Sequence, residues 1–235
     1  MVIAVVNKRG LTPVGDGGRA ADPPDDGSGR RRGRPVAIWD LDGALTRTDT
    51  LLPFLRRVAG TAAVVGALAV AASRDLPRRN ERDAARALLL QRILGGRPLD
   101  QVDQVARGYA ARLVAARLRP DSLARWSWHR REGHRLVIAS ASPGLYVHHL
   151  GRQLDADAVI CTEMTVVNGR LTGALRGGNC RGAEKARRVL AHLVEHPATR
   201  VWAYGGGDTD RPLLALADVA TRVTPHGRLP GWADR

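Results

Sequence analysis

Two carboxylates set one residue apart are the clearest candidates for chemistry in this chain. Asp40 and Asp42 follow the apolar run at residues 36–39, and Gly43 comes next. At the end of a buried strand, such a pair can direct one carboxylate and one backbone carbonyl into the same crevice, which suits a divalent cation with oxygen ligands. The pair also suits a carboxylate nucleophile beside a carboxylic acid. An Asp-rich loop that caps a helix would look the same, so the pair alone leaves both interpretations open.

Four later residues could serve the same crevice. Ser140 precedes an expected helix, where a hydroxyl and backbone amides can hold a phosphate, although a helix N-cap is the alternative role. Lys185 is one of only two lysines among 37 basic residues. A compact ammonium can bridge a carboxylate and a phosphate, and an exposed helix lysine is the alternative. Asp208 and Asp210 follow a run of three glycines, which indicates a flexible loop that carries two carboxylates.

The elements that must position these residues are short apolar runs that alternate with helical patterns. Strands are expected over residues 36–41, 135–141, 158–162, 164–167, 170–175, 200–204 and 220–223, and helices over residues 143–154, 183–195 and 212–217. The Asn-Gly pair at 168–169 predicts a β-hairpin. Strands that alternate with helices predict an α/β fold with a Rossmann-like parallel sheet. Ligands of such sheets bind at the carboxyl ends of strands, where Asp40, Ser140 and the glycine-rich loop all fall.

Between the first and second expected strands lies a long helical region rich in Ala, Leu and Arg. Gly and Pro divide it into four or five helices, with breaks near residues 60, 76–77, 95–98 and 119–120. The N-terminal tail is rich in Gly, Pro and Arg, which predicts disorder. The expected organisation is therefore a disordered tail over 1–34, an α/β core over 35–45 and 132–235, and a helical insertion over 46–131.

The composition restricts the partners and the compartment. A formal net charge of +14 favours anionic partners such as phosphoesters, nucleic acids or an acidic membrane surface. No basic and aromatic platform of the kind that binds nucleic acid and no zinc-ligand spacing accompanies the charge, so we expect no specific nucleic-acid partner. Cys161 and Cys180 show no metal-binding or redox spacing, which favours reduced thiols in a cytoplasmic protein.

One apolar segment raises the question of membrane contact. Residues 58–73 form a run of sixteen without charge, shorter than the roughly 20 residues that span a bilayer. A buried or interfacial helix is expected instead, which leaves peripheral membrane contact open.

Taken in order, these motifs resemble the haloacid dehalogenase-like hydrolases, specifically the phosphoserine-phosphatase-like branch, subfamily IB. The resemblance extends from about residue 36 to residue 225, and it rests on residues 40–50, 140–143, 168–173, 178–185 and 211–218. It implies a parallel α/β core closed by a helical cap, which residues 46–131 would form.

The resemblance implies a Mg²⁺-dependent phosphomonoester hydrolase. In that mechanism Asp40 attacks phosphorus and forms an aspartyl-phosphate, while Asp42 protonates the leaving oxygen and then activates water. Ser140, Lys185 and Gly43 would bind the phosphate oxygens, where charge builds in the transition state.

The metal site is where the chain departs from the family. Mg²⁺ would be held by Asp40, the backbone carbonyl of Asp42 and a carboxylate of the last loop. Gly206 stands where that carboxylate is expected. Asp208 or Asp210 could replace it, because the neighbouring glycines allow the loop to move. Otherwise the chain is a catalytically impaired protein that binds a phosphorylated ligand.

The resemblance constrains the substrate only in part. True phosphoserine phosphatases place Glu near the position of Asp49 to hold the amino group, so the shorter Asp49 does not favour phosphoserine. Ala44 replaces the usual Thr or Val, which is a mild change because backbone groups make most contacts in this loop. The expected substrate is a small-molecule phosphomonoester or a phospholipid phosphate.

Overall fold

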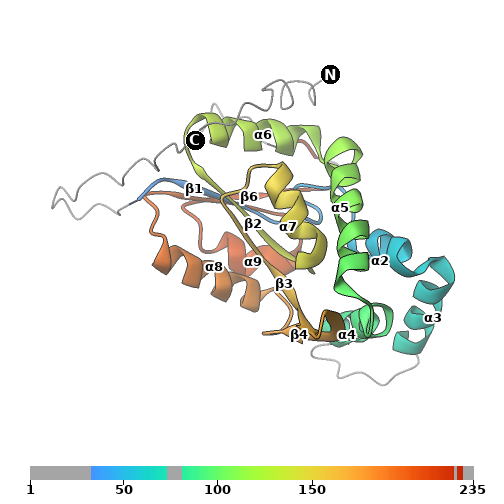
Figure 1. Cartoon of the computed structure of the whole chain (residues 1–235). Coiled ribbons are helices and arrows are strands. Elements are labelled where there is room, and N and C mark those ends of the chain that lie inside the picture. The colour runs from blue at the N-terminus through green and yellow to red at the C-terminus, as the bar shows by residue number, and fades with distance from the viewer. Residues whose placement is uncertain (1–32, 73–80, 225–226, 230–235) are drawn as a thin grey trace.

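A six-stranded sheet forms the centre of the protein (Figure 1). The computed structural model describes residues 33–72, 81–224 and 227–229. The strands are β1 (Val36–Trp39), β2 (Arg135–Pro143), β3 (Ala158–Val167), β4 (Arg170–Arg176), β5 (Val201–Gly205) and β6 (Val219–Arg222), in the spatial order β4-β3-β2-β1-β5-β6. All neighbouring pairs are parallel except the β3–β4 hairpin. The predicted α/β fold with a mostly parallel sheet is therefore confirmed.

The chain runs without interruption through β3, where the sequence analysis expected two strands. The first half of β3 pairs with β2 as far as Thr162, and the second half pairs with β4 from Glu163 onward. The ladder partner changes while the backbone stays extended, so apolar runs at 158–162 and 164–167 belong to one strand. The predicted tail lies outside the described residues up to residue 32, as does the predicted break at 76–77.

Alternating side chains of β1 fill two separate cores, which explains why this short strand is fully buried. Val36 and Ile38 pack with α8 (Ala183–Glu195) and α9 (Arg211–Leu214), whereas Ala37 and Trp39 pack with α6 (Pro120–Arg131) and α7 (Gly144–Gln153). Figure 1 shows α6 and α8 on opposite sides of the sheet. A parallel sheet covered on both faces places its ligand site at the strand ends rather than on a face.

Five helices lie between β1 and β2 among the described residues. Besides α6, they are α2 (Leu51–Ala59), α3 (Thr61–Ala72), α4 (Glu81–Leu94) and α5 (Leu99–Ala116). The division of the chain into core and cap remains a prediction. That division assigned α6 to the cap, but α6 packs on the sheet, since the Trp126 ring centroid lies 6.2 Å from that of Trp39. None of the described helices is long and apolar enough to cross a membrane.

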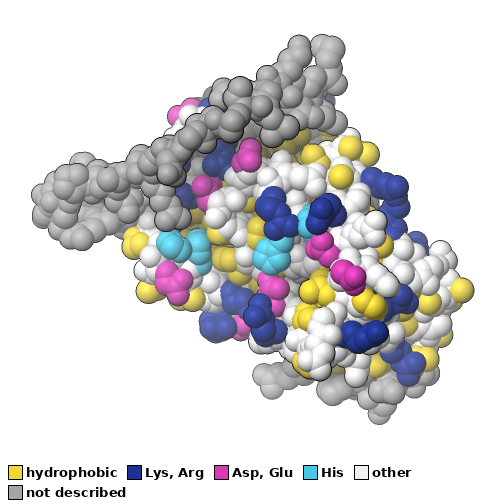
Figure 2. Space-filling model, viewed as in Figure 1, with side chains coloured by type: hydrophobic (Ala, Val, Ile, Leu, Met, Phe, Trp, Pro, Cys, Tyr) yellow, Lys and Arg dark blue, Asp and Glu magenta, His cyan; other side chains and the backbone are white. Residues whose placement is uncertain are grey.

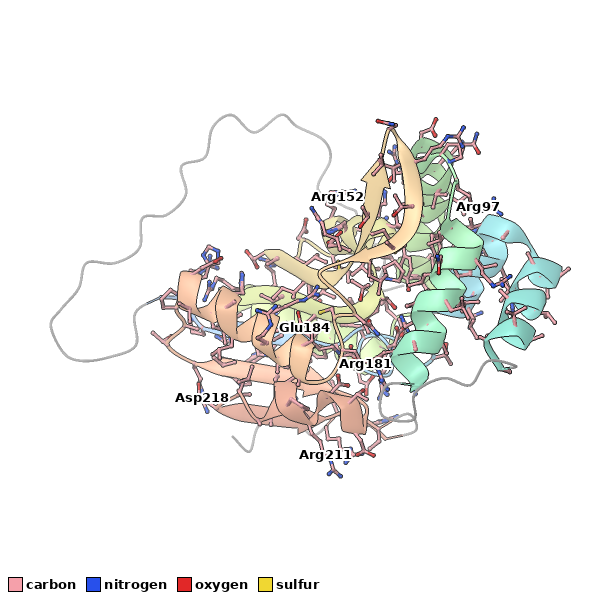
Figure 3. The ribbon with its side chains drawn as sticks, turned by 90° about the horizontal axis from the view of Figure 1, so that it is seen from below. Arg97, Arg152, Arg181, Glu184, Arg211 and Asp218 are labelled. Carbon is pink, nitrogen blue, oxygen red and sulfur yellow. The ribbon has the colours of Figure 1, made fainter. Side chains whose placement is uncertain are left out.

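The β3–β4 hairpin connects the core to the inserted helices. The turn between α4 and α5 pairs with the hairpin, since Gly96 N–H donates to the Leu171 carbonyl at 2.7 Å and Leu99 N–H donates to the Gly169 carbonyl at 2.9 Å. Figure 3 shows the hairpin standing beside these helices, with Arg97 labelled at the turn. Backbone hydrogen bonds from this hairpin therefore fix one end of the inserted region.

A pair of buried histidines, His129 on α6 and His134 just after it, packs beside Tyr204 of β5. The Tyr204 ring stacks on Trp39 at 3.7 Å between centroids, and its hydroxyl lies 2.8 Å from His129 Nε2. The second nitrogen of His129 lies 2.7 Å from His134 Nδ1. Burial lowers the pKa of His129 to about 3, and burial also lowers the pKa of His134. Both imidazoles are therefore neutral in the folded protein at pH 7.

We expect His129 to make the folded protein sensitive to mild acid. Below the unfolded-state pKa of about 6.5, the unfolded imidazole binds a proton that the buried imidazole refuses, so stability falls by about 1.4 kcal/mol per pH unit. Denaturant unfolding of the wild type and His129→Gln at pH 7 and pH 5 measures the effect. The stability advantage of the wild type over the variant should shrink by about 2 kcal/mol at pH 5. Parallel pH profiles for the two proteins would contradict this assignment.

Candidate active site

Asp40 occupies the central position at the carboxyl edge of the sheet. Its N–H donates to the Tyr204 carbonyl at 2.9 Å, which continues the β1–β5 ladder, and its carbonyl accepts from Leu45 N–H at 3.2 Å. The registers place Trp39 level with Ile138 of β2 and with Tyr204 of β5. The same registers bring Asp40 beside Ala139 of β2 and Gly205 of β5, and the residue Asp40 is 5% exposed.

A single ammonium group joins Asp40 to the last loop. Lys185 Nζ, from the first turn of α8, lies 2.7 Å from Asp40 Oδ1 and 2.7 Å from Asp210 Oδ1. Burial raises the pKa of Asp40 to about 7, against the opposing effect of the Lys185 charge. Burial by itself would lower the pKa of Lys185, but the two carboxylates together raise it above its usual range. Lys185 therefore stays charged between them.

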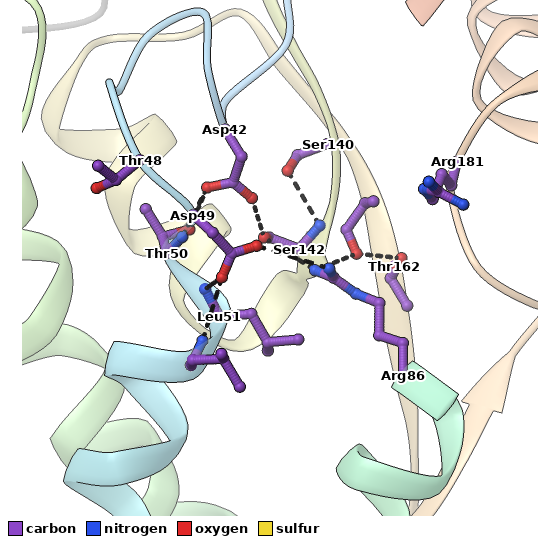
Figure 4. A network of polar contacts seen from close by, with 12 residues as sticks. Asp42, Thr48, Asp49, Thr50, Leu51, Arg86, Ser140, Ser142, Thr162 and Arg181 are labelled. Atoms are coloured by element: carbon purple, nitrogen blue, oxygen red, sulfur yellow. Dashed lines mark hydrogen bonds and ion pairs between the residues drawn. The ribbon is translucent and has the colours of Figure 1, made fainter. Parts of the chain in front are cut away.

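Asp42 is held by three donors (Figure 4). Thr50 donates through its backbone N–H and its hydroxyl to Oδ1 at 2.9 and 2.7 Å, and the Ser142 hydroxyl donates to Oδ2 at 2.7 Å. Burial raises the pKa of Asp42, and the charge of Asp49 raises it further. A fixed carboxyl group with a raised pKa is suited to give a proton to a leaving oxygen and take one from water.

Ser140 lies beside this network. Its Oγ accepts from Ser142 N–H at 3.0 Å, and the side chain is fully buried. The N-cap of α7 is Pro143, without a side-chain capping bond, so Ser140 does not have the alternative N-cap role. Because Ser140 accepts at Oγ, its O–H remains available for a ligand oxygen.

The last loop folds tightly against the first motif. A Cβ placed on Gly206 would lie 2.7 Å from the Gly43 carbonyl oxygen, closer than two such atoms approach in folded proteins. Gly43 itself has φ of +90°, a conformation that favours glycine. The Asp210 carboxylate draws the loop inward, because its Oδ2 accepts from the N–H groups of Gly206 and Gly207 at 3.0 and 3.1 Å. The glycine that replaces the expected aspartate is thus required by this packing.

The two acidic residues of the last loop have different surroundings. Asp210 is 2% exposed and belongs to the buried Lys185 cluster. The Asp208 side chain is 72% exposed and forms ion pairs with Arg222 at 2.9 Å and Arg211 at 3.3 Å. Of the two, only Asp210 shares a hydrogen-bonding partner with Asp40.

Arg86 is a site residue that sequence reasoning missed. From α4 it donates to the Ala141 carbonyl and to Ser142 Oγ, both at 3.2 Å, and it lies 4.0 Å from Asp49 Oδ2. Its buried Nε has no partner among the described atoms. Nothing in the sequence distinguishes this arginine from the many others in the helical insertion; only the fold brings it to Asp49.

Other contacts hold the inserted helices over the site. Asp83 of α4 accepts from Asn179 Nδ2 at 2.8 Å and lies 3.3 Å from Arg181 Nη1. Figure 3 shows Arg181 near the start of α8. A pocket of about 290 Å³ adjoins the site on the side of α2 and α5, and its lining includes Thr48, Asp49, Thr50, Arg57, Arg112 and Arg117. This pocket carries three positive charges against one negative charge.

The comparisons identify the family. The sequence model of the haloacid dehalogenase-like hydrolases matches residues 37–215, so the chain belongs to this family. Protein CicA of Caulobacter vibrioides is 36% identical over 187 residues, which cover 78% of this chain and 83% of that protein. Phosphoserine phosphatase SerB2 of Mycobacterium tuberculosis is 28% identical over 206 residues, which cover 86% of this chain and 47% of SerB2.

Solved structures give the same fold. A protein of unknown function from Bordetella pertussis superposes with a TM-score of 0.61 at 16% identity, covering 80% of this chain and 89% of its own. A probable phosphoserine phosphatase from Vibrio cholerae gives a TM-score of 0.58 at 19% identity, covering 80% of this chain and 55% of its own. These structures share the fold, and the family model together with the phosphatase relatives confirms the family that the motifs predicted.

The contact between Gly206 and Gly43 can be tested by adding one methyl group. We expect Gly206→Ala to lower the free energy of unfolding by about 1–3 kcal/mol, because its Cβ must displace backbone. Gly207→Ala is the matched control, since a Cβ there meets Thr209 Oγ1 at an ordinary 3.5 Å. Denaturant unfolding of both variants gives the comparison. Equal stability of the two would show that the loop does not pack against the first motif.

Proposed function

We propose that this protein hydrolyses phosphomonoesters through an aspartyl-phosphate on Asp40. The observation that carries the proposal is the buried Asp40 carboxylate, 2.7 Å from a charged Lys185 and two residues from an acid whose pKa is raised by burial. A nucleophile, a cation for the phosphate oxygens and a proton donor are the parts that phosphoryl transfer requires. The family membership and the phosphatase relatives support the same chemistry.

Each residue then has a defined role. The free Oδ2 of Asp40 attacks phosphorus while Oδ1 stays on Lys185. Asp42, oriented by Thr50 and Ser142, protonates the leaving oxygen and afterwards takes a proton from the water that attacks the aspartyl-phosphate. Ser140, with Lys185 and the N–H of Gly43, holds the equatorial oxygens on which charge builds.

The residues fit a Mg²⁺ ion held with few protein ligands. Asp40 and the backbone carbonyl of Asp42 supply hard oxygen donors, and Mg²⁺ sites commonly combine one or two carboxylates with waters and substrate phosphate. Bound there, Mg²⁺ would neutralise charge on the transferring phosphoryl group. Asp210, rather than the exposed Asp208, is the loop acid that we propose as a further ligand, and it would have to exchange a present hydrogen bond to reach the ion.

The impaired alternative follows from the same loop. Because Gly206 supplies no carboxylate and both oxygens of Asp210 already accept hydrogen bonds, metal affinity without substrate should be weak. In the alternative, the fold binds a phosphorylated ligand without turning it over. The two proposals differ in whether Asp40 becomes phosphorylated.

The substrate that we propose carries a second polar or anionic group. Arg86 Nη1 lies 4.0 Å from Asp49 Oδ2, and the adjoining pocket, whose lining includes Asp49, contains three further arginines. This arrangement favours a small anionic phosphomonoester. A lipid phosphate is the alternative class, supported by α3, which exposes Val65 and Leu68 by 54% and 38%. We also propose a cytoplasmic location, because Cys161 and Cys180 are free and disulfides are rare in that compartment.

Charged side chains of both signs are mixed on the face of the protein in Figure 2. On the face shown, arginine side chains are interspersed with acidic side chains and histidines rather than gathered in one basic band. The net charge of +14 therefore does not produce a single basic patch on this face. We propose small phosphoesters as the anionic partners and no specific nucleic acid.

Turnover of an aryl phosphate with Mg²⁺ tests the main proposal. Asp40→Asn should abolish hydrolysis and covalent labelling, because an amide cannot accept the phosphoryl group. Asp155→Asn is the matched control, since Asp155 is exposed and its φ of 53° suits asparagine. Mass spectrometry of quenched wild type should find one phosphoryl group on Asp40. Hydrolysis that survives Asp40→Asn would refute the mechanism, and ligand-induced stabilisation without turnover in the wild type would favour the alternative.

Arg86 should determine substrate affinity. For phosphomonoesters with a second anionic group, we expect Arg86→Gln to raise KM about tenfold or more, the loss of a hydrogen bond to a charged group. KM for a neutral aryl phosphate should change little. A panel that includes a lipid phosphate in vesicles separates the two substrate classes. An equal rise in KM for all substrates would show that Arg86 acts on the fold or on the shared phosphate instead.

A further inference from the structure

A second group of ligating side chains lies apart from the Asp40 cluster. His148 on α7 and Cys161 and Glu163 on β3 bring a ring nitrogen, a thiol and a carboxylate within 4.8 Å of one another. His148 Nε2 lies 2.8 Å from Glu163 Oε1, and the Cys161 thiol donates to the same oxygen at 3.2 Å. Cys161 Sγ lies 3.7 Å from His148 Nε2. We propose that these residues bind a thiophilic divalent cation, of which Zn²⁺ is the typical case.

Two elements create this arrangement. Cys161 and Glu163 are two residues apart on β3, so their side chains point to the same face of the strand. His148 reaches that face from α7, one helical turn after Gly144. A Cβ on Gly144 would lie 2.8 Å from Glu163 Oε2 and 2.9 Å from His148 Nε2, so glycine leaves the room that the cluster occupies. The ligands are therefore adjacent in the fold but separated by 13 residues in sequence, which is why cysteine spacing gave no signal.

The distances suit a small tetrahedral site. With bond lengths of about 2.0–2.3 Å, neighbouring N, O and S ligands of Zn²⁺ lie about 3.4–3.6 Å apart. Here the distances are 2.8 Å from His148 to Glu163, 3.2 Å from Cys161 to Glu163 and 3.7 Å from Cys161 to His148. The His148 and Glu163 atoms, now joined by a hydrogen bond, must therefore move apart by about half an ångström to bind the ion. His148 and Glu163 are 42% and 30% exposed, so their side chains can move and an ion can enter. Solvent would supply the fourth ligand.

The charges also balance. The Cys161 thiol donates a hydrogen bond to Glu163 Oε1, so the sulfur carries a proton when no cation is bound. Binding breaks the S–H bond, releases that proton to solvent and forms a metal–sulfur bond with the electron pair left on sulfur. A thiolate and a carboxylate then neutralise a divalent cation. The nearest described cation to Glu163 is Arg176, 3.9 Å away and 73% exposed, which can turn toward solvent.

The position gives the ion a structural consequence. Ser140 and Ser142 lie at the end of β2, shortly before α7, and the ion would join the first turns of that helix to β3. Binding there should stabilise the folded state and hold the loop that contacts Asp42. The site is separate from the proposed Mg²⁺ ligands, so its failure leaves the phosphatase proposal standing.

Titration of the full chain with Co²⁺, followed by Zn²⁺, tests the site. We expect thiolate-to-cobalt charge-transfer absorption that saturates at one ion per chain and disappears when Zn²⁺ is added. Cys161→Ser should eliminate this absorption, and His148→Ala should weaken Co²⁺ binding at least tenfold. Cys180→Ser and His149→Gln are the matched controls, because both residues lie outside the cluster.

The independence from the catalytic site is tested with Asp40→Asn, which should keep the absorption. Wild-type protein that shows no thiolate absorption at saturating Co²⁺ would overturn the proposal. Absorption that persists in Cys161→Ser or vanishes in Cys180→Ser would overturn it as well. A rise in melting temperature with Zn²⁺ in the wild type, absent from His148→Ala, would give support from a second measurement.

Discussion

One buried ammonium group holds the working edge of this protein together. Lys185 from α8 is shared between Asp40, at the end of β1, and Asp210, after β5. All three side chains are almost completely buried, so none of these charges can be satisfied by bulk water. Removing one partner from such a cluster typically costs about 3–5 kcal/mol, because a charge is left buried and unpaired. The ammonium therefore fixes the relative positions of the first motif, the last loop and the helix that carries it.

The shape of the last loop follows from this cluster. With Oδ1 of Asp210 on Lys185, its Oδ2 can gather the N–H groups of Gly206 and Gly207. That contact brings Gly206 against the backbone of Gly43, where no side chain fits. The absence of an aspartate at residue 206 therefore goes with a different loop conformation. In it, the Asp210 carboxylate binds backbone N–H groups and Gly206 packs tightly against Gly43, where the family pattern expects a metal ligand.

The sequence indicated the α/β fold and the residues that meet at its strand ends more fully than the arrangement of the inserted helices. Asp40, Ser140 and Lys185 could be placed because strand ends converge in a parallel sheet and because a rare lysine is conspicuous. Strand pairing decided what patterns could not, as in β3, where two apolar runs are one strand with different partners on its two halves. Arg86 could not be found, since its role depends on how α4 docks over Ser142. The His148, Cys161 and Glu163 cluster was hidden for the same reason: it forms between a helix and a strand.

Counting the charges at the site connects metal and substrate. With Asp42 protonated as the proton donor, ionised Asp40 and Asp210 bring two negative charges and Lys185 brings one positive charge, so this cluster is anionic before any ligand enters. A phosphate dianion alone would be repelled, and burial of Asp40 strengthens that repulsion because the surroundings screen it poorly. A divalent cation alone finds one available carboxylate oxygen, Oδ2 of Asp40, because Lys185 occupies Oδ1 of Asp40 and both oxygens of Asp210 already accept hydrogen bonds. On our proposal, Mg²⁺ and the phosphate substrate should therefore each bind better when the other is present, and this coupling is reciprocal. A free carboxylate at residue 206 would weaken the coupling, because the cation would then bind well without substrate.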